Sequence, residues 1–64
     1  MNYDFDIMLS DMTDEGLITL EIGVKPNGTP IYRVAVFDGK HWKGAKYSSF
    51  AAAHATYKLL RRIV

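Results

Sequence analysis

Apolar and polar positions alternate in three successive segments between residues 17 and 47. In residues 17–24 every even position is apolar, which is the period-two pattern of a half-buried strand. Residues 31–37 alternate in the same way, and residues 41–47 do so less regularly, with Gly44 as a candidate bulge. These segments predict three β-strands.

Short turn sequences join the predicted strands. Asn27-Gly28 and Asp38-Gly39 are dipeptides that favour the positive φ angles of a type I′ turn. Prolines flank the first turn and mark the limits of its strands, because proline cannot donate a ladder hydrogen bond. Two tight hairpins in succession predict an antiparallel meander.

The C-terminal part of the chain has the features of an amphipathic helix over residues 49–63. Ser48-Ser49 supplies an N-cap, and the residues that follow include neither Gly nor Pro. The apolar positions that share one helical stripe are Phe50, Ala53, Tyr57, Leu60 and Val64. We expect this helix to pack on the sheet face formed by the even positions of residues 17–24.

Residues 1–16 are compatible with a fourth strand, a short helix or a mobile arm. The alternating apolar positions of an edge strand are Tyr3, Phe5, Ile7 and Leu9, and those at helical spacing are Phe5, Met8, Leu9 and Met12. The expected fold class is α+β, in one domain over residues 1–64. It comprises an acidic arm (1–16), a three-stranded antiparallel meander (17–47) and one C-terminal helix (49–63) packed on one face.

A single helix covers only one face of such a sheet, so the second face is left to the N-terminal arm or to a partner. The side chains expected there are Leu17, Thr19, Glu21, Ile31, Arg33, Ala35 and Phe37, joined from the third strand by some of His41, Lys43, Ala45 and Tyr47. Ile31, Phe37 and Tyr47 make this face more apolar than a plain solvent-facing surface. We therefore predict these three residues as a partner interface.

The composition narrows the chemistry. The chain has no cysteine, which excludes disulfides and thiolate zinc sites and suits a reducing cytoplasm. His41 and His54 have no cluster of co-ligands nearby in the sequence, so we expect no metal and no cofactor. No stretch approaches the roughly 20 apolar residues of a membrane span, and nothing resembles a signal peptide. The predicted location is therefore the cytoplasm, without a membrane partner.

Charge is divided unevenly along the chain. Residues 1–24 hold six acidic residues and no Lys or Arg, whereas residues 25–64 hold all eight Lys and Arg and the single Asp38. Either the two halves neutralise each other in the fold, or one of them meets a charged partner.

Catalysis is not expected. Ser48, Ser49 and His54 lie close together in the sequence, but the serines cap a helix and a triad would need an orienting carboxylate. The carboxylates of the N-terminal arm lack surroundings that would shift a pKa for acid–base work, and there is no glycine-rich phosphate loop. We predict that the protein is not an enzyme.

Nucleic-acid binding is better supported by the residue pattern. Lys40, Lys43 and Lys46 follow the third strand and its turn with aromatic residues interleaved, and Arg33 lies on the neighbouring strand. Lysines contact phosphates, aromatic rings and arginine contact bases, and a β-ribbon can enter the major groove of a duplex. These four cations are the predicted nucleic-acid-binding residues, and double-stranded DNA is a candidate partner.

The stretch IYRVAVFDGKHWKGAKYSSFAAAHATYKLLRR, residues 31–62, resembles the DNA-binding domain of plant ethylene-response factors and the related arm-binding domain of tyrosine-type phage integrases. The helix matches the family at Ser49, Ala53 and Tyr57. It departs where Ala51 and Ala52 replace glutamates and where His54 and Thr56 replace alanines. The resemblance implies a regulatory DNA-binding protein. Its sheet contacts would come from Arg33 and Lys43, and its phosphate contacts from Lys40 and Lys46.

The alternative is a protein-binding modulator or a homodimeric interaction module that acts through the second sheet face. The three methionines all lie in the N-terminal arm, and methionine adapts to irregular contacts. Pairing between edge strands of two copies is a direct route to a dimer.

Overall fold

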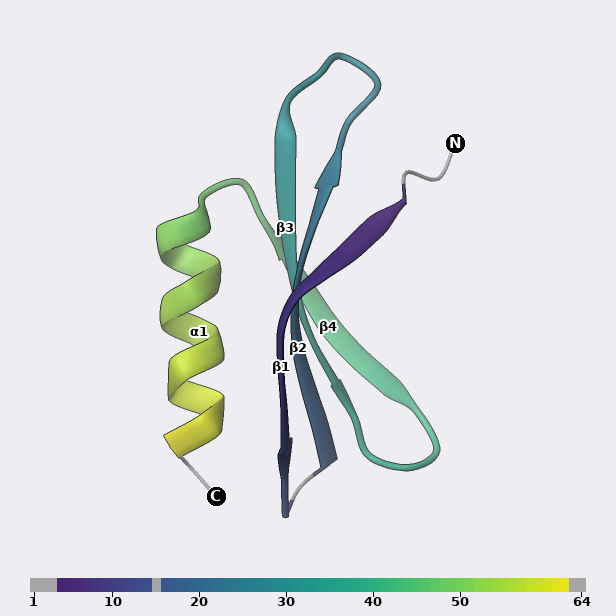
Figure 1. Cartoon of the computed structure of the whole chain (residues 1–64), viewed down its shortest axis with the longest axis vertical. Helices are drawn as coiled ribbons and strands as arrows, with labels where there is room; N and C mark the ends of the chain where they lie inside the picture. The colour runs from purple at the N-terminus through teal and green to yellow at the C-terminus, as the bar shows by residue number, and fades with distance from the viewer. Residues whose placement is uncertain (1–3, 15, 63–64) are drawn as a thin grey trace.

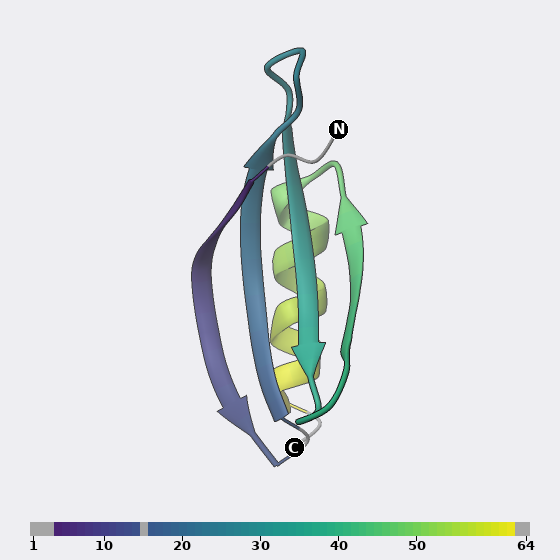
Figure 2. The same cartoon turned by 90° about the vertical axis from the view of Figure 1, so that its right-hand side faces the viewer.

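The computed structural model describes residues 4–14 and 16–62 and has an α+β fold (Figure 1). Its elements are β1 (Phe5–Thr13), β2 (Gly16–Val24), β3 (Pro30–Phe37), β4 (Trp42–Tyr47) and α1 (Phe50–Arg62). The strands form one antiparallel sheet in the order β1-β2-β3-β4, and the helix lies behind it (Figure 2). The predicted helix positions Ile63 and Val64 and the arm residues 1–3 and 15 lie outside the described residues.

The prediction of three strands is corrected to four, because most of the N-terminal arm forms β1. This strand pairs with β2 from Phe5↔Gly23 to Thr13↔Gly16. The pairing satisfies backbone groups that β2 would otherwise expose along its outer edge. The ring of Phe5 lies against Gly23, where an added Cβ would come within 3.1 Å of it.

The predicted bulge at Gly44 is wrong, and the irregularity lies in β1 instead. The β3–β4 register runs without a shift from Tyr32↔Tyr47 to Phe37↔Trp42, whereas the β1–β2 register shifts between Ile7 and Leu9. A Cβ on Gly44 would lie 2.9 Å from the carbonyl oxygen of Val34. The glycine therefore allows two strands to approach closely and does not interrupt their pairing.

Both predicted hairpins are present, but neither turn is of type I′, since the positive φ angles among the described residues all belong to glycines. In the first, the Lys25 N–H donates to the Thr29 carbonyl and encloses a three-residue loop. In the second, the Asp38 N–H donates to the carbonyl of His41, and Gly39 takes the positive φ at the first central position, as in a type II′ turn.

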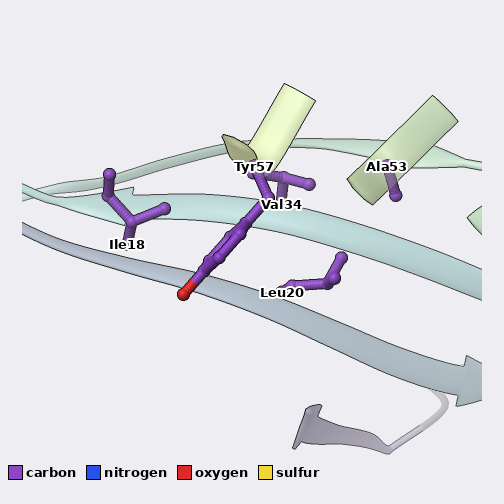
Figure 3. Packing of buried hydrophobic residues seen from close by; sticks show 5 residues of the cluster. All are labelled: Ile18, Leu20, Val34, Ala53 and Tyr57. Atoms are coloured by element: carbon purple, nitrogen blue, oxygen red, sulfur yellow. The ribbon is translucent and has the colours of Figure 1, made fainter. Parts of the chain in front are cut away.

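The core lies between the helix and the sheet, as the apolar pattern predicted. Its buried members are Ile18, Leu20, Val34, Ala53 and Tyr57 (Figure 3). The Ser49 hydroxyl accepts from the Ala52 N–H at 3.4 Å at the start of α1, in agreement with the predicted N-cap. No helix among residues 4–14 and 16–62 is long and apolar enough to cross a membrane.

Two polar contacts tie the helix to β1 across β2. The Tyr57 hydroxyl donates to Asp11 Oδ2 at 2.6 Å, and Arg61 Nε lies 3.0 Å from the same oxygen. Burial, with the hydrogen bond to Asp11, raises the pKa of Tyr57 to about 12. The hydroxyl is therefore kept protonated and available as a donor.

Candidate groove on the open face of the sheet

The open face is the side of the sheet that α1 does not cover, and Figure 2 looks directly onto it. Residues opposite each other in an antiparallel pair point to the same face, so the register assigns the paired strand positions to a face. The open-face positions are Phe5, Ile7, Ser10, Met12, Leu17, Thr19, Glu21, Gly23, Ile31, Arg33, Ala35, Phe37, Trp42, Gly44 and Lys46.

The expected contribution of β4 to this face is corrected. Lys43, Ala45 and Tyr47 pair with Val36, Val34 and Tyr32 and therefore lie on the helix side. Tyr47 packs against the core. Trp42, Gly44 and Lys46 take the open face instead, because the phase of β4 is set by its pairing with β3.

A row of charged and polar side chains lies across the middle of the open face. Glu21 is only 6% exposed and accepts a hydrogen bond from Thr19 Oγ1 at 2.7 Å. Arg33 donates to the same carboxylate from Nε, at 3.1 Å, and from Nη2. The guanidinium of Arg33 lies 4.1 Å from the ring centroid of Phe5, which is cation–π range. These side chains bury one another without a second layer of secondary structure above them.

A groove of about 650 Å³ runs over this row. Phe5 and Ile7 of β1 line one side, and Trp42 and Lys46 of β4 line the other. The first half of β1 and the start of β4 both lean away from the helix (Figure 1). Ala35 also lines the groove, and such small side chains leave room for a ligand.

Trp42 is the most accessible aromatic side chain of the groove and the sole tryptophan of the chain. It is 55% exposed, and its ring centroid lies 5.0 Å from that of Phe37 with an interplanar angle of 32°. Phe37 is thus half-covered by Trp42, whereas Ile31 is buried. Of the three residues predicted as a partner interface, only Phe37 is both on the open face and partly accessible.

The four predicted cations are placed differently from one another. Arg33 is bonded to Glu21 inside the groove, and Lys46 lies directly across from it on β4. Lys43 belongs to the opposite face but lines the groove from the edge strand. Lys40 is exposed in the β3–β4 turn. The three lysines therefore follow the β4 rim of the groove and do not join Arg33 in a patch on its floor.

The β3–β4 turn is held by its own aspartate. Asp38 Oδ1 accepts hydrogen bonds from the backbone N–H groups of His41, at 2.8 Å, and of Lys40, at 2.9 Å. These bonds lower the pKa of Asp38 below its usual value. The turn that presents Lys40 is therefore fixed by an ionised side chain at neutral pH.

Six residues of the groove lining were not predicted as site residues from the sequence: Phe5, Ile7, Glu21, Ala35, Trp42 and Gly44. Phe5 and Ile7 alternate with polar residues as in an edge strand. Which side chains they contact depends on the strand that β1 pairs with, and the sequence does not give that pairing. Glu21 stood out only as a charged residue on the second face, and its link to Arg33 depended on the β2–β3 register.

No family model, curated protein or solved structure matches this chain in the comparisons made with known proteins.

Proposed function

We propose that the protein is a non-catalytic binding protein that holds single-stranded nucleic acid along the β4 side of the groove. The observation that carries this proposal is the exposed Trp42, packed against Phe37, at a rim that also carries Lys43 and Lys46. Proteins that bind single strands combine aromatic platforms for the bases with cations that follow the phosphates. Lys40 would extend the phosphate track into the turn.

Single strands fit this surface better than a duplex does. Arg33, the base-reading residue that the resemblance implied, is occupied by Glu21 and stacked on Phe5. A β-ribbon that reads the major groove presents side chains that protrude toward the bases. This face has a groove in the corresponding place. A volume of about 650 Å³ is in the range of pockets for small ligands, and so suits an unpaired base.

A non-catalytic role is supported by the state of the buried carboxylate in the groove. Glu21 accepts hydrogen bonds from both Thr19 and Arg33. A carboxylate held in this way is committed to the fold and is not available as a general base.

The test uses the fluorescence of the sole tryptophan, Trp42. Adding a deoxythymidine oligomer should quench it, because a base stacks on the indole. With three phosphate contacts, the affinity should fall roughly 20-fold between about 50 and about 200 mM salt, since each contact adds ~0.7 to the logarithmic slope. A duplex of equal length should bind more weakly.

Matched variants locate the binding surface. Lys43→Ala and Lys46→Ala should each lower the affinity and reduce the salt slope by a little under one. Lys58→Ala is the control, because it removes one positive charge from an exposed position on α1. Equal effects of all three substitutions, or no quenching at either salt concentration, would contradict the proposal.

Protein binding is the second candidate, and a different observation favours it. Ile7 and Met12 on the β1 side of the open face are 62% and 77% exposed, which is more apolar surface than a phosphate track uses. Met12→Glu should then abolish lysine crosslinks to a protein partner while leaving oligonucleotide quenching of Trp42 unchanged, because Met12 does not line the groove. Loss of both the crosslinks and the oligonucleotide quenching would show that protein and nucleic acid do not use separate surfaces.

A further inference from the structure

The two edges of the sheet carry opposite charge. β1 holds Asp6 and Asp11 and no Lys or Arg, with Asp4 directly before it and Asp14 directly after it. The acidic residues of this edge are thus unbalanced within their own strand. β4 holds Lys43 and Lys46 and no acidic residue. The division of charge seen along the chain is therefore a division between the left and right edges of the sheet in Figure 2.

The edges are too far apart to neutralise each other within one molecule. β2 and β3 lie between them, which separates β1 from β4 by about 14 Å at ~4.8 Å per strand spacing. Exposed charges at that distance are screened, since the Debye length is about 8 Å at physiological salt. Among residues 4–14 and 16–62, ion pairs join the two halves of the chain at Glu21 with Arg33 and at Asp11 with Arg61.

Both edges also expose apolar side chains. On β1, Ile7, Met8 and Leu9 are all exposed, and on β4 Trp42 is. The outer edge of each strand has no neighbouring strand among the described residues, so its backbone groups are open to pairing with another chain. The β1 edge thus combines negative charge, apolar surface and unpaired backbone, and the β4 edge is its positively charged counterpart.

We propose that the partner of the acidic edge is a second copy of this chain, with β4 of one copy added alongside β1 of the next. The sheet has four strands of alternating direction, so β1 and β4 run in opposite directions. A copy displaced sideways therefore presents its β4 antiparallel to β1, with both helices on the same side. This inference does not rest on nucleic-acid binding, although it uses the same rim.

The side chains that would meet at this interface are complementary on both faces of the extended sheet. On the helix side, either Asp6 or Asp11 of β1 meets Lys43 of the neighbouring copy, depending on the register. On the open face, Ile7 or Met12 meets Trp42. Pairing of like edges would instead place aspartates beside aspartates or lysines beside lysines, which is unfavourable across strands.

Such an interface is head-to-tail, so each copy retains one unused edge. Repeated addition produces either a closed ring or an open chain. The assembly should therefore grow with protein concentration and shrink with added salt. Nucleic acid that occupies the β4 rim should dissociate it.

The test is a complementation of charge-reversed variants, measured by sedimentation velocity at about 50 mM salt and about 500 mM salt, where screening is stronger. The double variant Lys43→Glu with Lys46→Glu has two acidic edges, and Asp4→Lys with Asp6→Lys places two lysines on the first half of β1, so that the β1 edge no longer carries a net negative charge. Asp11 is left intact because it bonds Tyr57 and Arg61. Each variant alone should be monomeric, and an equimolar mixture should associate at the lower salt.

A crosslink reports the interface directly. A carbodiimide joins only a carboxylate and an amine in contact, so a bond between Asp6 and Lys43 requires two molecules. A mixture of isotopically light and heavy protein should yield mixed Asp6–Lys43 crosslinks. A wild-type protein that stays monomeric at both salt concentrations, or a dimer that survives both charge reversals without this crosslink, would overturn the proposal. Circular dichroism confirms that each variant is folded.

Discussion

Leu20 and Glu21 are neighbours on β2, and both are almost completely buried, yet different structures bury them. Leu20 points toward α1 and is covered by a second layer that includes Ala53 and Tyr57. Glu21 points to the open face, where the side chains of its own sheet cover it. Arg33 lies across Glu21, and Phe5 lies against Arg33.

The two faces are consequently held by different interactions, apolar packing on one and hydrogen bonds and charge pairing on the other. Apolar burial under the helix is non-directional, so it tolerates changes that conserve volume and suffers when a cavity forms. The polar row of the open face is directional, and each member is satisfied only while its partner is present. The helix face therefore stabilises the fold, and the open face specifies the shape of the groove.

The largest expected effect is on the helix face. Leu20→Ala should lower the free energy of unfolding by about 3 kcal/mol, because the helix cannot collapse fully into the cavity. A domain of this size has a total stability of only about 3–10 kcal/mol, so partial unfolding at room temperature is expected. Urea denaturation followed by circular dichroism measures it. Leu20→Met, which conserves volume, is the control, and a loss equal to that of the alanine variant would refute a cavity effect.

Breaking the open-face row should come next. Arg33→Ala leaves Glu21 buried without its charged partner and should cost about 2–3 kcal/mol. Removing both charges with Glu21→Leu and Arg33→Leu should recover at least half of that loss, because apolar groups can replace a buried pair. A double variant that is less stable than Arg33→Ala in the same urea titration would contradict this account of the open face.

Tyr57 combines apolar packing and a directional hydrogen bond in one side chain. Its ring packs in the core, and its hydroxyl donates to Asp11. Tyr57→Phe keeps the ring but loses the bond to Asp11, which should cost roughly 1–2 kcal/mol near neutral pH. The folded pKa of Tyr57 is about 12, above the ordinary value of about 10, so ionisation favours the unfolded chain. The advantage of the wild type is complete below pH ~10 and is lost as the pH rises toward ~12. Thermal melts of both proteins across this window should converge, and a constant difference would contradict the assignment.

The smallest effect on stability is expected at Trp42, where function should change most. Its side chain is more than half exposed, so Trp42→Ala should alter the free energy of unfolding by less than about 0.5 kcal/mol. Loss of one stacking platform should nevertheless weaken oligonucleotide binding by about 1–3 kcal/mol, or roughly 5- to 150-fold. Anisotropy of a labelled oligomer measures this, since the variant has no tryptophan. Unchanged affinity would exclude Trp42 as the platform.

The candidate site was only partly predictable. The lysines of the third predicted strand stood out beside interleaved aromatic residues, but Lys43 was a candidate for the open face and lies on the helix side. Tyr47 was expected on the open face, but residues 41–47 alternate poorly, and the phase of β4 is set by its pairing with β3. The groove itself depends on Phe5, whose position over Arg33 requires both the β1–β2 and the β2–β3 registers.

What the sequence by itself determined are the features that arise within a few residues. The helix Phe50–Arg62, the two hairpins and the apolar face around Leu20 follow from local periodicity, turn residues and capping. The tertiary structure decided that residues 5–13 join the sheet, which face each side chain of β4 takes, and that Glu21 is held by Arg33. These outcomes depend on pairing between distant segments. Residues 5–13 fit a strand and a helix equally well, and they form a strand because the edge of β2 is available for pairing.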